Sequence, residues 1–209
     1  MKLVVLTAPS GAGKTTIARR LLDAIPSMRF SVSATTRPAR PGETDGADYH
    51  FLSRERFDSM KNAGAFIENE EVYEGLYYGT LKSELEAAVA DSPILLDIDV
   101  KGALNVKRRY GDDVYVVFIK APSLSELKKR LELRATESAH SVEARLQRAL
   151  DEQKFEDRFD HVVVNDNLDD AVTETISQVM EFLWAAGVNH SDQSPNTDQL
   201  STGNVDQNR

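Results

Sequence analysis

Cysteine, long hydrophobic runs and positive charge are missing or scarce in this 209-residue sequence. The lack of cysteine excludes disulfide bonds, thiolate metal sites and a thiol nucleophile, and it is compatible with a reducing cytosol. The apolar run at residues 3–6 is far shorter than a signal-peptide core or the roughly 20 apolar residues of a membrane-spanning helix. We therefore expect a cytoplasmic protein without a membrane anchor.

Positive charge is in deficit, because 25 Lys and Arg residues face 34 Asp and Glu residues, for a net charge of -9. This balance argues against a surface that binds nucleic acid or anionic lipid through positive charge. It leaves room for a local basic site that binds a small polyanion. We expect neither nucleic acid nor membrane as a partner, and the sequence leaves the oligomeric state undetermined.

The composition that remains, 41% hydrophobic and 28% charged, is typical of a globular protein. The length favours one domain with an inserted subdomain. Residues 187–209 contain almost no apolar side chains. Such a segment buries too little surface to offset its ordering entropy, and we predict a disordered tail.

Short, continuously apolar runs alternate with helix-like segments along the chain. The runs are typical of strands covered on both faces, and they lie at 3–6, 94–100, 114–119 and 161–165. Helices are expected at 15–25, 82–90, 125–133, 142–157 and 168–184. This alternation predicts an α/β fold with a mostly parallel sheet core flanked by helices.

Two regions interrupt the alternation and divide the chain. Residues 33–81 have short β-like pieces and no long apolar strand, which indicates a small inserted subdomain. Residues 123–157 carry two successive helices without a strand between them, which we interpret as a helical lid. The core would then consist of residues 1–32, 82–122 and 158–186.

The segment APSGAGKT at residues 8–15 follows the first strand and opens the first helix. It fits the phosphate-loop pattern G-x-x-x-x-G-K-[ST] at Gly13, Lys14 and Thr15, with Ala8 in place of the first glycine. Backbone N–H groups of such a loop converge on phosphate, the lysine reaches the β and γ phosphates, and the Thr15 hydroxyl can ligate Mg²⁺. We expect an ATP-binding segment made of Ala8, Pro9, Ser10, Gly11, Ala12, Gly13, Lys14, Thr15 and Thr16. The loop alone leaves ATPases, GTPases, transporters and small-molecule kinases open.

A second candidate phosphate site contains Arg37 and Arg40. Pro38 disfavours helix at Arg37, so this segment is expected to be extended or turned. Two guanidinium groups there can clamp one phosphate, although arginines in a loop are otherwise simply solvated.

The string around these arginines resembles the guanylate kinases. Their pattern S-x-S-x-T-T-R-x-x-R-x-G-E-x-x-G-x-D-Y matches residues 31–49, and further matches are FIE at 66–68, YYGT at 77–80, LDID at 96–99 and VND at 164–166. The resemblance runs to about residue 184. It implies a P-loop kinase that transfers a phosphoryl group from ATP to GMP, and to dGMP, with Mg²⁺ as cofactor. It makes residues 33–81 the GMP-binding subdomain, and it implies a role in GMP recycling and purine metabolism.

The resemblance also assigns roles to the acceptor site. The residues implied for the GMP phosphate are Arg37, Arg40, Tyr49 and Tyr78, and those implied for guanine are Ser33, Glu68 and Thr80. An ionised carboxylate accepts from both guanine donors while a hydroxyl donates to O6, and adenine reverses two of these groups. Without the resemblance, Glu68 is one member of an acidic cluster at 68–71.

The donor site implied by the resemblance adds lid arginines. Arg130 and Arg134 share one helix face, and Arg145 lies on the next helix. The resemblance assigns all three to the ATP phosphates and leaves Arg148 outside its pattern. Asn165 is implied to line the adenine pocket. Because a phosphate monoester is mostly dianionic at neutral pH, no general base is required, and the expected catalytic residues are Lys14, Arg37, Arg130, Arg134 and Arg145.

Two carboxylates, Asp97 and Asp99, lie at the end of an apolar run. Ligands bind at this edge of open parallel sheets, and packing does not account for charges in so apolar a segment. The resemblance places Asp99 near GMP and near Mg²⁺, which it would contact through water, with Asp97 in support.

Two other functions fit parts of the sequence. One is a catalytically silent guanylate-kinase-like binding module, which the intact Gly13, Lys14 and Thr15 argue against. The other is a P-loop kinase for a different phosphorylated acceptor, which Ser33, Glu68 and Thr80 argue against.

Overall fold

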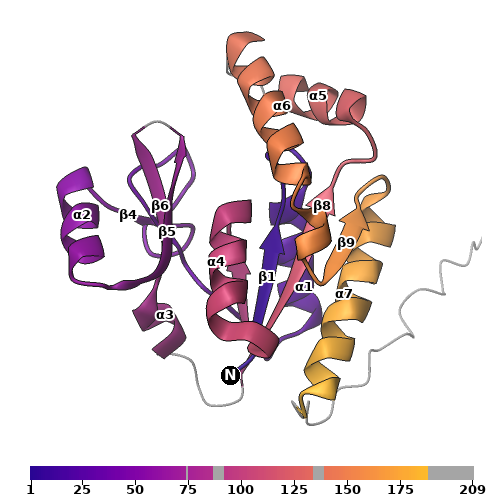
Figure 1. Cartoon of the computed structure of the whole chain (residues 1–209), viewed down its shortest axis with the longest axis horizontal. Coiled ribbons are helices and arrows are strands. Elements are labelled where there is room, and N and C mark those ends of the chain that lie inside the picture. Colours follow the sequence, from indigo (N-terminus) through magenta and orange to yellow (C-terminus); the bar gives the residue numbers. More distant parts are fainter. Residues whose placement is uncertain (74, 87–91, 134–138, 188–209) are drawn as a thin grey trace, which may run out of the picture.

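A five-stranded parallel sheet forms the centre of the computed structural model, which describes residues 1–73, 75–86, 92–133 and 139–187 (Figure 1). Its order is β2-β7-β1-β8-β9. The strands are β1 (Leu3–Thr7), β2 (Arg29–Phe30), β7 (Ile94–Asp97), β8 (Val114–Lys120) and β9 (His161–Val164). The parallel α/β core that the alternating pattern predicts is confirmed.

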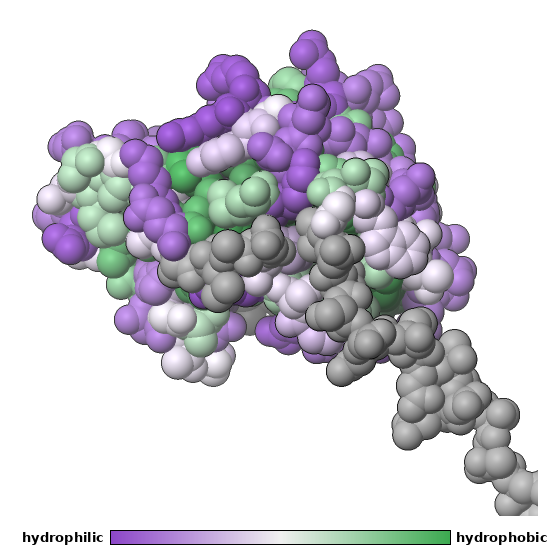
Figure 2. Space-filling model, turned by 90° about the horizontal axis from the view of Figure 1, so that it is seen from below, coloured by the Kyte–Doolittle hydropathy of each residue, from purple (hydrophilic) through white to green (hydrophobic). Residues whose placement is uncertain are grey.

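Seen from below, the side on which the chain begins, hydrophilic residues surround a more hydrophobic centre (Figure 2). Within the part of the chain that the structure describes, no helix is long and apolar enough to span a membrane.

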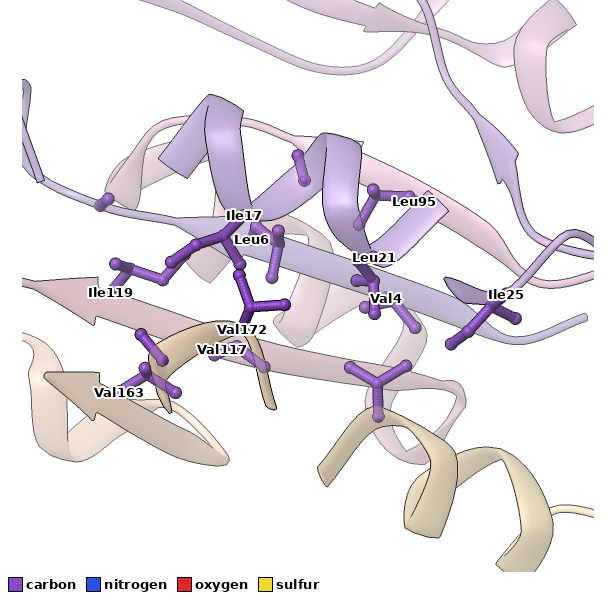
Figure 3. Packing of buried hydrophobic residues seen from close by; sticks show 14 of the residues in the cluster. Val4, Leu6, Ile17, Leu21, Ile25, Leu95, Val117, Ile119, Val163 and Val172 are labelled. Carbon is purple, nitrogen blue, oxygen red and sulfur yellow. The ribbon is translucent and has the colours of Figure 1, made fainter. Parts of the chain in front are cut away.

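Helices cover both faces of this sheet, which explains why its strands are apolar without alternation. On β1, Val4 and Leu6 point to the face covered by α1 (Lys14–Ala24) and α7 (Leu168–Ala185), where they join one hydrophobic cluster (Figure 3). Leu3 and Val5 point to the other face, in the cluster that includes α4 (Val100–Tyr110). All four side chains are fully buried.

The inserted region forms a second, mixed sheet with the order β4-β3-β6-β5. Its strands are β3 (Ala34–Thr35), β4 (His50–Phe51), β5 (Phe66–Tyr73) and β6 (Leu76–Leu81). Helix α2 (Arg54–Asn62) packs on it through Phe57, whose ring stacks on Phe66 with centroids 4.6 Å apart. Helix α3 (Lys82–Glu86) leads back to the core sheet. The insertion therefore has a small core of its own, which also contains Ala34 and Leu81.

Two helices, α5 (Leu124–Leu133) and α6 (Ala139–Gln153), pack on each other at the top of Figure 1. Leu127 and Leu131 of α5 share a separate hydrophobic cluster with Val142 and Ala149 of α6. Short 3₁₀ turns, η1 (Gly111–Asp113) and η2 (Glu156–Arg158), precede β8 and β9. The helix expected at 142–157 corresponds to α6, which begins earlier, at Ala139, and ends earlier, at Gln153. That this pair is a lid stays a prediction, as do the boundaries of the three divisions.

Two helices, α2 and α4, are absent from the sequence-based expectations. The apolar run 94–100 is wrong as a single strand, because β7 ends at Asp97 and α4 begins at Val100. Asp99 is the N-cap of α4, and its Oδ1 accepts from the N–H of Gly102 at 2.9 Å. Ser53 caps α2 in the same way through Arg56. Both starts are polar caps of the kind that end a strand and open a helix. The helix expected at 82–90 is described only to Glu86, and residues 188–209 of the expected tail lie outside the described residues.

Candidate active site

A pocket opens at the carboxyl edge of the core sheet, between that sheet, the inserted sheet and α6. Its lining includes residues 8–15, Ser33, Arg40, Tyr49, Glu68, Tyr78, Asp97, Asp99 and Arg145 from the sequence-based expectations. Residues Glu70, Val72, Arg148 and Glu152 also line it, although the expected site did not include them. Segments far apart in the chain therefore meet at one site.

The phosphate loop is held in shape at Gly13, which has a φ of 99° and is the N-cap of α1. The buried Asn165 donates from Nδ2 to the carbonyl of Ala12 at 2.8 Å. A Cβ at Gly13 would lie 2.2 Å from that nitrogen, so this position requires glycine for space as well as for φ. Asn165, expected beside adenine, is placed behind the loop and is 5% exposed. Thr16, on α1 after the loop, is exposed.

Lys14 extends from the first residue of α1 to the end of β7. Its Nζ donates to the Ile98 carbonyl at 2.7 Å and lies 2.7 Å from Asp97 Oδ1. The ammonium group is thereby fixed at the pocket wall, beside the loop whose N–H groups can bind phosphate.

Asp99 is held from two sides. Its Oδ1 caps α4, and its Oδ2 lies 3.2 Å from Nη2 of Arg148 on α6. Arg148 also donates from Nε to Glu152 Oε1 at 2.6 Å. Arg148 is three residues after Arg145 on the same helix, so a shared helical face was the signal available in the sequence.

Glu68 is the most deeply buried carboxylate of the pocket, with 7% of its surface exposed. Its Oε1 accepts from the N–H of Thr80 at 2.9 Å and from the Thr80 hydroxyl at 2.7 Å. Burial raises the pKa of Glu68 to about 7, while the hydrogen bonds from Thr80 act in the opposite direction. Because folding raises this pKa, the stability that Glu68 contributes is present below its unfolded pKa and is lost as pH rises through about 7. Ser33 is buried in the same wall, and Thr80 lies fully buried behind Glu68.

The two arginines of the insertion are organised by Glu43. Its Oε1 lies 2.8 Å from Nη2 of Arg37, and its Oε2 accepts from the N–H of Arg40 at 2.7 Å. Arg37 lies over the ring of Tyr49, 5.4 Å from its centroid, and Tyr49 lies 5.9 Å from Tyr78. The hydrogen bond that Arg37 donates to Glu43 raises the pKa of Arg37, and burial raises that of Tyr49 to about 12. Arg40 lines the pocket, whereas Arg37 pairs with Glu43 beside it.

Only some of the cations expected to bind phosphate, which are Lys14, Arg37, Arg40, Arg130, Arg134 and Arg145, line the pocket. Lys14, Arg40 and Arg145 line it, whereas Arg130 is bonded along its own helix to Glu126 at 3.2 Å and is not part of the lining. Arg134 lies outside the described residues. The lining carries four cations, Lys14, Arg40, Arg145 and Arg148, against five carboxylates, Glu68, Glu70, Asp97, Asp99 and Glu152. The lining therefore has no excess of positively charged side chains.

The oxygen donors around the loop suit a hard cation. Thr15, Asp97 and Asp99 line one part of the pocket. Within the described ranges, no three Asp, Glu, His or Cys side chains form a metal-binding group. Hydroxyl and carboxylate oxygens beside a phosphate loop fit Mg²⁺, which takes one or two protein ligands and completes its shell with water and substrate phosphates.

Known proteins are similar to this chain over most of its length. The guanylate kinase family profile matches residues 1–185. A guanylate kinase of Salinibacter ruber is 60% identical over 181 residues, which cover 87% of this chain and 96% of that protein. The chain belongs to the guanylate kinase family.

Other members of the family are similar over the same range. A guanylate kinase of Chlorobium luteolum is 52% identical over 87% of this chain and 92% of that protein. The crystal structure of guanylate kinase from Anaplasma phagocytophilum has a TM-score of 0.71 and 33% identity, and covers 90% of this chain and 87% of that one. The resemblance read from the motifs is confirmed, and with it the family fold.

Gly13→Ala tests the geometry of the family's phosphate loop in this chain. The positive φ costs an alanine about 1–2 kcal/mol. Displacing Asn165 adds about 1–3 kcal/mol, because the Ala12 carbonyl loses its donor. The control is Gly42→Ala, where φ is 87° and nothing lies within 4 Å of a Cβ. Urea denaturation should give a larger loss of unfolding free energy for Gly13→Ala, and equal losses would contradict the role of Asn165.

Proposed function

We propose that the protein is an ATP:GMP phosphotransferase of the cytoplasm that also accepts dGMP and that acts in GMP recycling. The observation that carries this proposal is the pocket itself, on which both the phosphate loop with Lys14 and the buried Glu68 open. One site can therefore bind a phosphate donor and a guanine-containing acceptor side by side.

The donor side consists of the phosphate loop and cations from α5 and α6. Residues 8–16 bind the ATP phosphates through backbone N–H groups and Lys14, and Asn165 keeps the loop in shape. Arg130, Arg134 and Arg145 add positive charge to the same phosphates. Arg130 would have to leave Glu126, an exchange that is inexpensive for a partly exposed pair on one helix.

The acceptor side consists of the inserted sheet and the end of β7. Guanine has two donors, N1–H and the exocyclic amine, and the ionised Glu68 accepts from both. The Ser33 hydroxyl, which lines the pocket, serves O6, because the Thr80 hydroxyl already donates to Glu68. The GMP phosphate is bound by Arg37, Arg40, Tyr49 and Tyr78, which lie together around Glu43 and the Tyr49 ring. Asp97 and Asp99 lie between the two sides.

In the reaction, an oxygen of the GMP phosphate forms a bond to the γ-phosphorus of ATP while the bond from that phosphorus to the bridging oxygen breaks and ADP leaves. The attacking phosphate is already mostly ionised, so the protein has to position two polyanions and stabilise the transferring group. Lys14 suits this task because Asp97 and the Ile98 carbonyl fix its ammonium before any phosphate contact. Thr15, and Asp99 through water, would hold Mg²⁺, which would supply further neutralisation of the phosphate charge.

A coupled assay of ADP release with GMP, dGMP, AMP, CMP and UMP tests the function. We expect turnover with GMP and dGMP at least about 100-fold above the others, because buried polar groups reject a base with reversed donors and acceptors. Turnover of another monophosphate above GMP would indicate a kinase for a different acceptor. No turnover, with GMP still bound, would indicate a silent binding module.

Lys14→Ala tests the division between the two sides. We expect kcat to fall by about 100-fold or more, because one fixed charge at the transferring group is lost. The Kd of GMP, measured by calorimetry, should stay within a few-fold. The matched control is Lys120→Ala, since Lys120 ends β8 with comparable exposure and pairs with Glu156 at 2.9 Å. A comparable loss of GMP affinity in Lys14→Ala would contradict the division.

Glu68→Gln tests the reading of guanine. In glutamine an NH₂ group replaces one of the two accepting oxygens and meets a donor instead of an acceptor. The Kd of GMP should therefore rise by at least about tenfold while that of ATP changes little. Glu71→Gln is the control from the same strand, because Glu71 bonds Gly75 and Tyr77 instead. Unchanged GMP affinity in Glu68→Gln would remove Glu68 from base recognition.

A comparison of the wild-type protein with Glu68→Gln also allows a test by pH. With a pKa near 7, Glu68 becomes protonated as pH falls, and GMP affinity should fall by about tenfold between pH 8 and pH 6. The GMP phosphate also titrates near pH 6, so the ratio of the wild-type and Glu68→Gln affinities isolates the carboxyl. A ratio that does not change with pH would contradict the assignment.

A further inference from the structure

We propose that Arg148 is a positioning residue for phosphoryl transfer, which acts by holding Asp99 from the α6 side of the pocket. This inference rests on the function proposed above and adds to it a residue outside the family pattern that implied the other site residues. Lys14 provides the parallel, because it holds the neighbouring carboxylate, Asp97, from the phosphate-loop side.

The first observation is the way in which Asp99 is fixed. Oδ1 accepts from the N–H of Gly102 at the start of α4, and Oδ2 lies 3.2 Å from Nη2 of Arg148. The carboxylate therefore has one oxygen held by the core and the other by α6. A carboxylate held at both oxygens keeps one orientation, and only 16% of the Asp99 side chain is exposed.

The second observation is that Arg148 itself is braced. Glu152, one helical turn further on, accepts from Nε at 2.6 Å, and only 13% of its side chain is exposed. Burial raises the pKa of Glu152, and the hydrogen bond with Arg148 acts against that rise. The guanidinium of Arg148 thus contacts two carboxylates, Asp99 and Glu152. Removal of this cation would leave both carboxylates partly buried without its charge.

The third observation concerns what this ion pair connects. The apolar side chains of α6 belong to a cluster shared with α5, which is separate from the two clusters on the core sheet. The pair between Arg148 and Asp99 joins α6 to the N-cap of α4, close to the end of β7. Because Arg145 is on the same helix and also lines the pocket, the pair fixes that helix relative to the reacting phosphates.

Loss of Arg148 affects the reaction through Asp99, which loses the contact to one of its two fixed oxygens. The orientation of Asp99 toward GMP and toward the place proposed for Mg²⁺ is then less defined. This change acts on the transferring phosphoryl group more than on the guanine subsite around Glu68.

The test compares Arg148→Gln, Arg148→Lys and wild type in steady-state kinetics with GMP and ATP. We expect Arg148→Gln to lower kcat by about 10- to 100-fold, the usual effect of losing a residue that orients a catalytic ligand. The KM for GMP should stay within about threefold, and Arg148→Lys should recover part of the kcat. Lys154→Gln is the matched control, because Lys154 lies just beyond α6 and forms an exposed pair with Asp151. It should keep the wild-type kcat.

A double-mutant cycle separates positioning from direct phosphate contact. Asp99→Asn keeps the cap of α4, since asparagine is a good N-cap. If Arg148 acts through Asp99, adding Arg148→Gln to Asp99→Asn should change kcat by less than about threefold. Effects that multiply would overturn the proposal, as would an Arg148→Gln protein with a lower melting temperature but the wild-type kcat. A wild-type protein that does not phosphorylate GMP would instead refute the proposed function.

Discussion

The loop between β1 and α1 keeps its shape because Gly13 has no side chain. The space that a Cβ would occupy is taken by the amide of Asn165, which reaches from the end of β9 to the carbonyl of Ala12. This contact fixes the start of α1 and hence Lys14, whose ammonium then reaches Asp97 and Ile98 beyond β7. One close approach therefore connects β9, β1 and β7 around the pocket, and the geometry of the donor site depends on it.

The charge of the site follows from the cost of fixing cations in a partly buried place. A cation held away from water requires a partner, so Lys14 pairs with Asp97 and Arg148 with Asp99 and Glu152. The carboxylates orient these cations but cancel their charge, and the lining holds four cations and five carboxylates. Two nucleotides therefore have to compete with carboxylates for these cations. Because of this competition, we expect the proposed reaction to require Mg²⁺ and further arginines such as Arg130 and Arg37, which pair with Glu126 and Glu43.

The sequence predicts those parts of the fold and of the site that are encoded by a pattern within a few consecutive residues. The apolar runs of β1, β8 and β9 and the phosphate loop lie within a few consecutive residues, and each was found from its own segment. The helix α4 was missed because Asp99 acts as an N-cap at the end of an apolar run, where composition alone favours a longer strand.

Arg148 and Glu152 were missed for a different reason. The spacing of Arg145 and Arg148 indicates a shared helix face, but what that face contacts depends on how α6 lies against the core, which no short pattern encodes. Glu68 was separated from its acidic neighbours only by resemblance, and its burial supplies the physical reason.

In the proposed function, base selection depends on the protonation state of Glu68, which its burial influences. As a carboxylate it accepts from two donors, which matches guanine, but as a carboxylic acid it carries a donor of its own, which matches the N1 acceptor of adenine. Burial raises its pKa to about 7 and so favours the acid, whereas both hydrogen bonds from Thr80 favour the carboxylate. In the function proposed here, Thr80 therefore acts on the choice of base from behind the pocket wall, by favouring the ionised form of Glu68.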